Sequence, residues 1–304
     1  MTQYLIGTGG WAYFNIPSKS SLKAYSEIFN FVEVNYTFYK YPDQKMVEHW
    51  RRIAPKNFMF TVRCHQDLTH RIGLKPVNDA YSIFYRMISY CRMLEAPFLL
   101  LETPKSYALN ENSLRCARDF FSTITTKGVR LAWETRTPVT EKTMRLMQDF
   151  DIVHSVDLSR EQPAYVSDVV YTRLFGKGNH NIYQFTDEEL VEIDQRGMKL
   201  QAKAIIASFH GVRMNVDALR FKQYKEKGEF LAVTKFTGID SARSVLQEDA
   251  QFPCSKTELV ENQGWKVVDL TTDKRIHLSE LLSRIPEKTY NSVEEVVSVL
   301  EVQP

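Results

Sequence analysis

The sequence predicts a TIM-like (β/α)8 barrel followed by a small helical module. Three observations favour this fold class. Eight short apolar segments recur within the first 208 residues, helical patterns separate most of them, and a polar, mostly charged residue ends nearly every one. Strands that alternate with helices of this length form βαβ units, and eight such units close a parallel barrel. The sixth connection, 157–163, is too short for a full helix, so an open doubly wound sheet is the alternative.

The expected strands are short runs rich in branched and aromatic side chains. Such side chains are typical of strands because they pack well on a pleated surface. In chain order, the expected strands are Tyr4 to Thr8, Phe31 to Asn35, Met59 to Arg63, Phe98 to Glu102, Val129 to Glu134, Ile152 to Asp157, Val169 to Arg173 and Ala204 to Ser208. Near the first strand, Gly7, Gly9 and Gly10 predict a tight turn, since no phosphate-binding glycine pattern accompanies them.

The expected helices repeat apolar residues at a spacing of three and four. The clearest covers residues 78–94, where Tyr81, Phe84, Ile88 and Cys91 fall on one face. Ser, Thr and Asp residues stand where several of these patterns begin, as N-cap residues do. The full set covers residues 18–30, 43–53, 78–94, 111–126, 140–150, 186–198 and 216–225.

The charged residues at the strand ends are expected to meet at one end of the barrel. Side chains alternate along a strand, so Glu33 shares a face with Phe31, and Arg63 shares a face with Thr61. In (β/α)8 enzymes, residues at the C-terminal ends of the strands build the active site. Burying many charges is costly unless they pair, bind metal or meet a charged ligand, so an internal salt-bridge lattice is the alternative to a site. The charges expected there are Glu33, Glu102, Glu134, Asp157, Arg63 and Arg173.

Composition predicts a globular, cytoplasmic protein without membrane contact. The chain has 304 residues, of which 43% are hydrophobic and 12% aromatic. No apolar run approaches the roughly 20 residues that span a bilayer, and the first residues lack the basic start and apolar stretch of a signal peptide. The four cysteines are widely spaced, which fits reduced thiols better than disulfides.

The net charge of +2 is unevenly divided along the chain. Residues 225–304 hold ten Lys and Arg against fourteen Asp and Glu, which leaves +6 on residues 1–224. A mildly cationic barrel attracts phosphates, although it lacks the clustered basic face of a dedicated nucleic-acid binder.

The character of the sequence changes after residue 224. We expect the barrel to cover residues 1–226, a charged linker to cover 227–250 and a small helical module to cover 251–304. Ser255 with Glu258, and Ser292 with Glu295, form capping-box patterns that open short helices. A module of this size is near the lower limit of independent stability, so we expect it to dock, and a protein partner is one candidate for it to bind.

Six segments along the chain carry a family resemblance. They are IGTGGWAYF (6–14), FNFVEVNYTFYKYP (29–42), FMFTVRCHQDLTH (58–70), AWETRTP (132–138), VDLSREQP (156–163) and YTRLFGKGNHNIY (171–183). Together they resemble the domain of unknown function 72 family, the YecE-like TIM barrels, which implies a TIM-like barrel and brings no established reaction. That family usually has His where this chain has Phe175, Lys at Arg63, and an Asn pair at Ala207 and Ser208. Residues 251–301 are similar to the module called domain of unknown function 2795.

The predicted function is hydrolysis of a phosphoester at the C-terminal end of the barrel, with a phosphorylated small molecule or a nucleic acid as substrate. Carboxylate and imidazole ligands suit a divalent ion that activates water, and arginine grips phosphate with paired hydrogen bonds. The presence and identity of a metal stay open, because no HxH, HxD or HExxH spacing supports one. The candidate catalytic residues are Glu33, Glu134, Asp157 and His70, with His65 as an alternative metal ligand. The candidate ligand-binding residues are Trp11, Tyr13, Asn35, Tyr39, Arg63, Arg136, Arg173, Lys177 and Tyr183.

Two other functions stay open on the sequence. In a carbohydrate-directed acid/base enzyme, Glu134 beside Arg136 would stay ionised while a less compensated Glu33 held a proton. Aromatic side chains near the strand ends would stack a sugar ring or a nucleobase. Alternatively, the barrel binds a nucleotide or a protein without turnover.

Overall fold

The computed structural model describes residues 2–14 and 20–302. The chain divides into two compact units, which are described separately below. The first comprises residues 1–174 and 196–209, and the second comprises residues 175–195 and 210–304.

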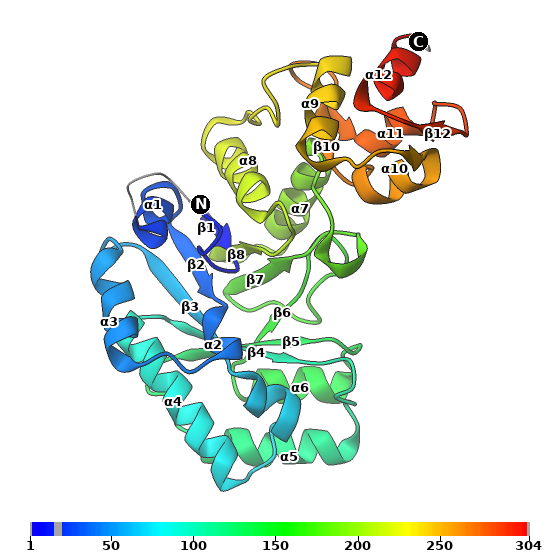
Figure 1. The fold of residues 1–304 in the computed structure, drawn as a ribbon. Helices are drawn as coiled ribbons and strands as arrows, with labels where there is room; N and C mark the ends of the chain where they lie inside the picture. Colours follow the sequence, from blue (N-terminus) through cyan, green and yellow to red (C-terminus); the bar gives the residue numbers. More distant parts are fainter. Residues whose placement is uncertain (1, 15–19, 303–304) are drawn as a thin grey trace. The chain divides into compact units, whose positions relative to one another are not determined.

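The first unit holds eight parallel strands in the order β6-β5-β4-β3-β2-β1-β8-β7 (Figure 1). The predicted barrel is confirmed: a parallel bridge between Val156 and Thr172 joins the two outer strands, and Arg173 N–H donates to the carbonyl of Val156 at 3.0 Å. The sixth strand ends at Ser155 rather than at Asp157 as expected. Beyond Ser155, the isolated bridge at Val156 continues the pairing with β7. The strands are β1 (Gln3–Thr8), β2 (Phe31–Val34), β3 (Met59–Arg63), β4 (Phe98–Thr103), β5 (Arg130–Thr135), β6 (Val153–Ser155), β7 (Val169–Leu174) and β8 (Ala204–Phe209).

Apolar side chains from the inward faces of these strands fill the barrel interior. They form one buried cluster that takes a residue from seven of the eight strands, with Met59 of the remaining strand packed against it. Full burial of each such side chain contributes about 1.5–3 kcal/mol. The alternation predicted from the sequence is therefore confirmed, since Phe31, Phe98 and Ala132 lie on the same faces as the charged strand ends. The cluster is Leu5, Phe31, Phe98, Leu100, Ala132, Val153, Tyr171 and Ile206.

Gly7 lies inside strand β1, where its register partner is Phe31 of β2. A Cβ atom at this position would approach the carbonyl oxygen of Phe31 to 2.0 Å. The expectation of a tight turn at Gly7 is therefore wrong: this glycine permits close approach of two strands.

Helices connect most of the barrel strands and begin close to where the sequence predicts. The side chain of Asp43 accepts from the N–H of Met46, and Asn110 caps the helix that follows it. As expected, the described chain has no helix between β6 and β7. A π-helical turn at Asp67–Ile72 was not predicted. The helices are α1 (Ser21–Ile28), α2 (Tyr36–Tyr39), α3 (Gln44–Ile53), α4 (Asn78–Leu94), α5 (Glu111–Thr123), α6 (Glu141–Asp149) and α7 (Asp187–Lys199), the last of which crosses the boundary between the units.

The second unit contains the C-terminal segment, which is mixed α/β rather than purely helical. Two small antiparallel pairs, β10 with β11 and β9 with β12, accompany its helices. The expected linker 227–250 includes helix α9, whose Ala242, Val245 and Leu246 belong to the buried core of the segment. The elements are α8 (Met214–Lys227), α9 (Ile239–Asp249), β9 (Cys254–Ser255), α10 (Lys256–Gln263), β10 (Val267–Asp269), β11 (Arg275–His277), α11 (Leu278–Leu282), β12 (Thr289–Tyr290) and α12 (Val293–Val302).

Of the two capping boxes predicted in this segment, the first is complete and the second is partial. Ser255 and Glu258 exchange hydrogen bonds at the start of α10, which confirms the pattern. At the start of α12, Ser292 Oγ accepts from the N–H of Glu295, whose side chain accepts from the N–H of Asn291. Over the residues described, every helix is too short or too polar to traverse a lipid bilayer.

A buried chain of ion pairs runs through the second unit. Arg220 lies 3.1 Å from Asp217 and 2.5 Å from Asp187. Arg275 lies 2.7 Å from Asp187 and 2.7 Å from Asp269. Asp187 thus joins the two guanidiniums, and the relay connects α7 and α8 with the strand pair β10–β11.

His154 is a buried titratable side chain on strand β6. Its Nδ1 accepts a hydrogen bond of 2.9 Å from the N–H of Ala164. Burial lowers the pKa of His154 from 6.5 to about 4, so the imidazole is neutral in the folded protein.

We expect His154 to make the protein less stable as the pH falls from 6.5 to 4. Within this window the unfolded chain binds a proton at His154 and the folded chain does not. A contribution of about 3 kcal/mol that is present above pH 6.5 is therefore lost by pH 4. Urea unfolding of the wild type and of His154→Gln at pH 7 and pH 4.5 measures it, and the same pH dependence in both proteins would contradict the assignment.

Candidate functional site at the C-terminal end of the barrel

Arg173 lies at the centre of a cluster of charges at the C-terminal end of the barrel strands. From the end of β7 it places Nε 3.2 Å and Nη2 3.0 Å from the two carboxylate oxygens of Glu33 on β2. Its Nη1 lies 2.6 Å from Glu102 on β4 and also donates to Glu134 on β5. The Arg173 side chain is 1% exposed. One guanidinium thus joins three strands, and it separates Glu102 from Glu134, which are register neighbours on β4 and β5.

Arg63, at the end of β3, forms the second buried cation of the cluster. Its Nη2 lies 2.6 Å from Glu102, and its Nη1 donates to the side chain of Asn35. The guanidinium lies over the ring of Phe38, with its carbon 3.6 Å from the ring centre. Among the residues that the structure describes, the buried Nε of Arg63 has no hydrogen-bond partner. A buried N–H donor without an acceptor costs about 1–3 kcal/mol, so an acceptor from a ligand would be stabilising here.

Arg136, just after β5, is the third and most accessible cation. Its Nε lies 2.7 Å from Glu134, and its Nη2 lies 3.2 Å from Glu102. The side chain is 35% exposed. If Arg136 turned toward a ligand, Glu134 would keep Arg173, and Glu102 would keep both Arg173 and Arg63. We call the six residues Glu33, Glu102, Glu134, Arg63, Arg136 and Arg173 the charge lattice.

The charge lattice favours the ionised forms of Glu102 and Arg173. Burial alone would raise the pKa of Glu102, but Arg173, Arg63 and Arg136 outweigh it and hold this pKa at about 2. Burial alone would lower the pKa of Arg173, but the three glutamates raise it well above its ordinary value. With three carboxylates and three guanidiniums, the lattice carries no formal net charge. The salt-bridge lattice considered as an alternative is therefore present, and within it the buried Nε of Arg63 has no partner in the described chain.

Glu33 does not fit the role of a proton donor. Both of its oxygens accept from Arg173, and Oε2 also accepts from the hydroxyl of Tyr171 at 2.9 Å. The Tyr171 hydroxyl in turn lies 2.7 Å from Thr61. The expectation that Glu33 is poorly compensated is wrong, because the guanidinium that pairs with it comes from a strand 140 residues away in the sequence. The same pairing and burial direct the Arg173 guanidinium at the three glutamates of the lattice.

Asp157 follows the short strand β6 and is bound mainly by its own loop. Its Oδ1 accepts from the N–H of Ser159 at 2.9 Å and from the Ser159 hydroxyl at 2.6 Å, and Oδ2 lies 3.7 Å from Arg160. Nearby, partial burial together with Asp157 and Glu134 raises the pKa of Glu161. The end of β6 therefore places a carboxyl group with a raised pKa, that of Glu161, near the carboxyl group of Asp157.

His70 lies in the π-helical turn after β3, within electrostatic reach of Arg63 and Arg136. Its Nδ1 is 2.9 Å from the hydroxyl of Thr69, and its ring meets the edge of Phe38 at a centroid distance of 5.1 Å. Burial lowers the pKa of His70 below 6.5, and Arg63 and Arg136 lower it further against the opposing effect of Glu102. A neutral imidazole next to guanidiniums can accept a proton at neutral pH.

The predicted aromatic residues divide between packing and exposed positions. Trp11 meets Trp50 at a centroid distance of 5.2 Å and Phe60 at 6.5 Å, so it packs at the barrel rim. Tyr13 and Tyr39 are 83% and 58% exposed.

Lys177 and Tyr183 belong to the second unit rather than to the barrel unit. Both contact Glu189, with Lys177 Nζ at 2.9 Å. The structure thus joins these two residues to each other through a shared carboxylate.

The carboxylates of the charge lattice do not fit a divalent metal. Throughout the described ranges, no three His, Cys, Asp or Glu side chains are grouped to hold an ion. Glu33 and Glu134 direct their oxygens at guanidiniums, and the His65 ring stacks on Tyr41 at a centroid distance of 3.8 Å.

Sequence reasoning placed Glu102 at a strand end without giving it a role, and it missed Tyr171, Phe38 and Ser155. Glu102 contacts all three guanidiniums of the charge lattice. The buried hydroxyl of Ser155, next to Glu134 in register, finds no partner in the described part of the chain. The alternation that selected Glu33 and Arg173 also puts Tyr171 and Ser155 on the inward face, and that signal could have found them.

Comparison with known proteins agrees with this fold. The model of the family described as protein of unknown function DUF72 matches residues 5–230. A crystal structure of a DUF72 family protein from Thermotoga maritima matches with a TM-score of 0.61 at 20% identity, covering 74% of this chain and all of that one. A DUF72 family protein from Enterococcus faecalis matches with a TM-score of 0.57 at 15% identity, covering 74% of this chain and 94% of that one. None of the curated proteins compared matches the chain.

Proposed function

The chain belongs to the DUF72 family, and we propose that the C-terminal end of its barrel binds a phosphorylated ligand and hydrolyses its phosphoester. Arg136 and Arg63 bind the phosphoryl oxygens, and His70 accepts a proton from the water that attacks phosphorus. The ester P–O bond breaks, and the departing alkoxide takes a proton from protonated His70 or from solvent and leaves as an alcohol. A phosphorylated small molecule and a nucleic-acid phosphodiester share this chemistry.

The unpartnered Nε–H of Arg63 is the observation that carries the proposal. A donor that is buried, charged and unsatisfied within the described chain favours an anionic acceptor over a neutral one. Arg136 adds a second guanidinium that shares Glu102 with Arg63. The guanidiniums of Arg63 and Arg136 both lie at the Glu102 carboxylate. Phosphoryl oxygens that bind there replace the contact between Arg136 and Glu102.

Arg136 can leave the charge lattice at small cost. It is the most exposed of the three arginines, and both of its carboxylate partners keep another guanidinium. The Arg136 guanidinium is 35% exposed, so a ligand can replace its contacts more easily than those of Arg173, which are fully buried and costly to break. The glutamates therefore position the cations, and the phosphate takes the place of Arg136's weaker contacts.

Hydrolysis requires a base near the bound phosphate. His70 is neutral at pH 7 because burial and the neighbouring guanidiniums lower its pKa. A proton acceptor in this position contributes a factor of about 10²–10⁴ to the rate. Since the lattice carboxylates are engaged by arginine, the proposed reaction draws its charge stabilisation from guanidiniums rather than from a metal.

Replacing Arg136 by glutamine tests the phosphate site. We expect the dissociation constant for pyrophosphate or a nucleoside monophosphate, measured by calorimetry with a chelator present, to rise about tenfold or more. Arg145→Gln is the matched control, since Arg145 is an exposed arginine on α6 that pairs with Glu141. Unchanged affinity in Arg136→Gln would contradict the proposal.

His70→Gln separates binding from hydrolysis. Lost turnover with retained binding in this variant supports hydrolysis. Binding without turnover in the wild type would contradict hydrolysis and leave a phosphate-binding protein.

A second candidate rests on Glu161. Its N–H donates to the carbonyl of Asp157 at 2.9 Å, and partial burial, Asp157 and Glu134 raise its pKa. A carboxyl group with a raised pKa near a second carboxyl group is the arrangement that carbohydrate-directed acid/base enzymes use. Turnover of glycosides that is lost in Glu161→Gln and retained in Arg136→Gln would favour this function over phosphoester hydrolysis.

A further inference from the structure

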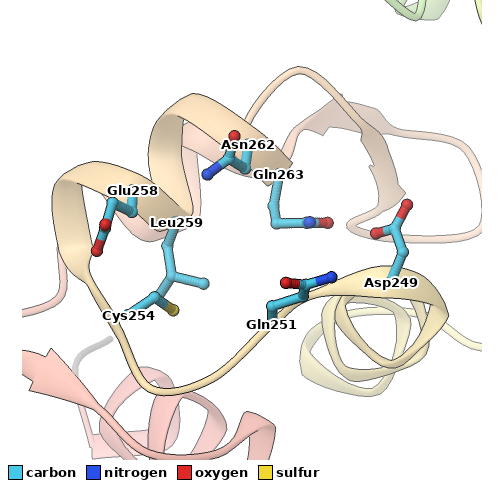
Figure 2. Close-up of a pocket in the computed structure, with 7 residues that line it drawn as sticks. All are labelled: Asp249, Gln251, Cys254, Glu258, Leu259, Asn262 and Gln263. Carbon is cyan, nitrogen blue, oxygen red and sulfur yellow. The ribbon is translucent and has the colours of Figure 1, made fainter.

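The second unit contains a cavity that the barrel chemistry does not use. Its volume is about 330 Å³, and it lies between the end of α9, the following segment and helix α10 (Figure 2). Six of the seven side chains that line it carry polar atoms or sulfur, and Leu259 supplies an apolar wall. The lining residues are Asp249, Gln251, Cys254, Glu258, Leu259, Asn262 and Gln263.

Gln263 presents a buried hydrogen-bond acceptor to this cavity. The residue is 6% exposed, and Figure 2 shows its carboxamide extended from α10 toward Asp249 and Gln251. The amide group donates to Asp249, whereas Oε1 has no partner anywhere in residues 2–14 and 20–302. An unsatisfied buried carbonyl oxygen requires a donor, and here that donor can come only from outside the described chain or from solvent.

The charges around the cavity favour a cationic hydrogen-bond donor for Gln263 Oε1. Asp249 and Glu258 line the cavity, and the neighbouring Glu248 adds a third carboxylate. In the described chain two cations contact this group: Lys266, through Asp249 and, at 3.7 Å, through Glu248, and Arg213, through Glu248. Three carboxylates against two cations still leave an excess of negative charge. Phosphate and carboxylate ligands are therefore disfavoured, and a ligand with charged N–H donors is favoured.

We propose that this cavity binds a guanidinium or alkylammonium group, with Gln263 Oε1 and the Asp249 carboxylate as acceptors. The alkyl stem of the ligand lies against Leu259. A volume of about 330 Å³ admits a molecule of the size of an arginine or lysine side chain. The group can come from a free diamine or agmatine-like molecule, or from a basic side chain of a peptide, and the two sources share the same recognition.

The thiol of Cys254 gives a native reporter for occupancy. Cys254 lines the cavity and is partly accessible, Cys116 is partly accessible in the barrel unit, and Cys64 and Cys91 are buried. We expect agmatine to slow the alkylation of Cys254 by iodoacetamide in the full chain, with no change at Cys116, as followed by mass spectrometry. Acetyl-Gly-Arg-Gly-amide is the peptide arm: protection by both molecules assigns basic side chains as ligands, and protection by agmatine alone assigns a free small cation.

Gln263→Met removes the acceptor and keeps the size of the side chain. We expect the agmatine concentration for half-protection of Cys254 to rise about tenfold or more in this variant. Asn291→Ala, an exposed position outside the cavity, is the matched control. Equal protection in Gln263→Met would overturn the proposal, as would protection by glutamate as strong as by agmatine. If Gln263→Met fails to fold, the wild type still decides, because undiminished alkylation of Cys254 at saturating agmatine rules out a cation in this cavity.

Discussion

Replacing Arg173 by methionine is expected to lower the free energy of unfolding of the barrel unit by about 3–5 kcal/mol. The substitution keeps most of the side-chain volume but removes the guanidinium that contacts Glu33, Glu102 and Glu134. Glu33 would then be a fully buried carboxylate that retains the Tyr171 hydroxyl but loses its guanidinium. Urea unfolding followed by tryptophan fluorescence measures the effect, and in a Trp265→Phe background the remaining tryptophans, Trp11, Trp50 and Trp133, all belong to the barrel unit.

The control for Arg173→Met is an arginine of the same unit whose ion pair is exposed. Arg118 lies 2.6 Å from Asp149 with about half of each side chain in solvent, so Arg118→Met is expected to cost at most about 1 kcal/mol. Equal and small losses in the two variants would show that the charge lattice contributes nothing beyond a surface pair. The lattice would then not be rigid enough to position Arg136 for a ligand, as the proposal requires.

Arg275→Met is expected to destabilise the second unit by about 3–5 kcal/mol. Its guanidinium lies 2.7 Å from both Asp187 and Asp269, and all three residues are buried. Asp187 would keep Arg220, but Asp269 would keep only uncharged donors, which include the N–H of Thr234 at 2.7 Å and the Thr234 hydroxyl at 3.0 Å. Hydrogen exchange should therefore become faster both in α7 residues 187–195 and in β10 and β11, because the relay connects them.

Lys288→Met serves as the control in the second unit. Lys288 pairs with Glu295 at 2.6 Å on the surface, so its loss should leave exchange in α7 and β10 unchanged. If Arg275→Met accelerated exchange only around β11, residues 175–195 and 239–302 would not form one cooperative unit. That outcome would favour the boundary near residue 226 that the sequence predicts.

The strands and their inward faces could be read from the sequence because each is a local pattern. Alternation of Phe31 with Glu33 and of Tyr171 with Arg173 is set by the two-residue period of a strand, and the barrel core confirms it. The pairing within the charge lattice could not be read in this way. Arg173 contacts Glu33 across 140 positions, and which of several carboxylates it meets depends on strand register and on the single bridge that closes the barrel.

The division of the chain was harder to predict for the same reason. The stretch 227–250 carries charges typical of a linker, yet Val245 and Leu246 are buried once they meet residues such as Val268 and Leu282 from later in the chain. Likewise, Lys177 was predicted as a ligand-binding residue of the barrel end, and in the structure it belongs to the second unit, where it pairs with Glu189. Local sequence patterns predict the helices and strands, whereas the unit to which each of them belongs depends on contacts between residues far apart in the sequence.

The central claim is that Arg63 and Arg136 bind a phosphoryl group while Arg173 stays within the charge lattice. Solution NMR of protein labelled with ¹⁵N at arginine Nε tests it directly, with signals assigned by Arg63→Lys and Arg136→Lys. Titration with a nucleoside monophosphate should shift the Nε–H signals of Arg63 and Arg136 saturably and leave that of exposed Arg145 unchanged. Saturable binding without a shift at Arg63, or no binding at millimolar ligand, would contradict the account.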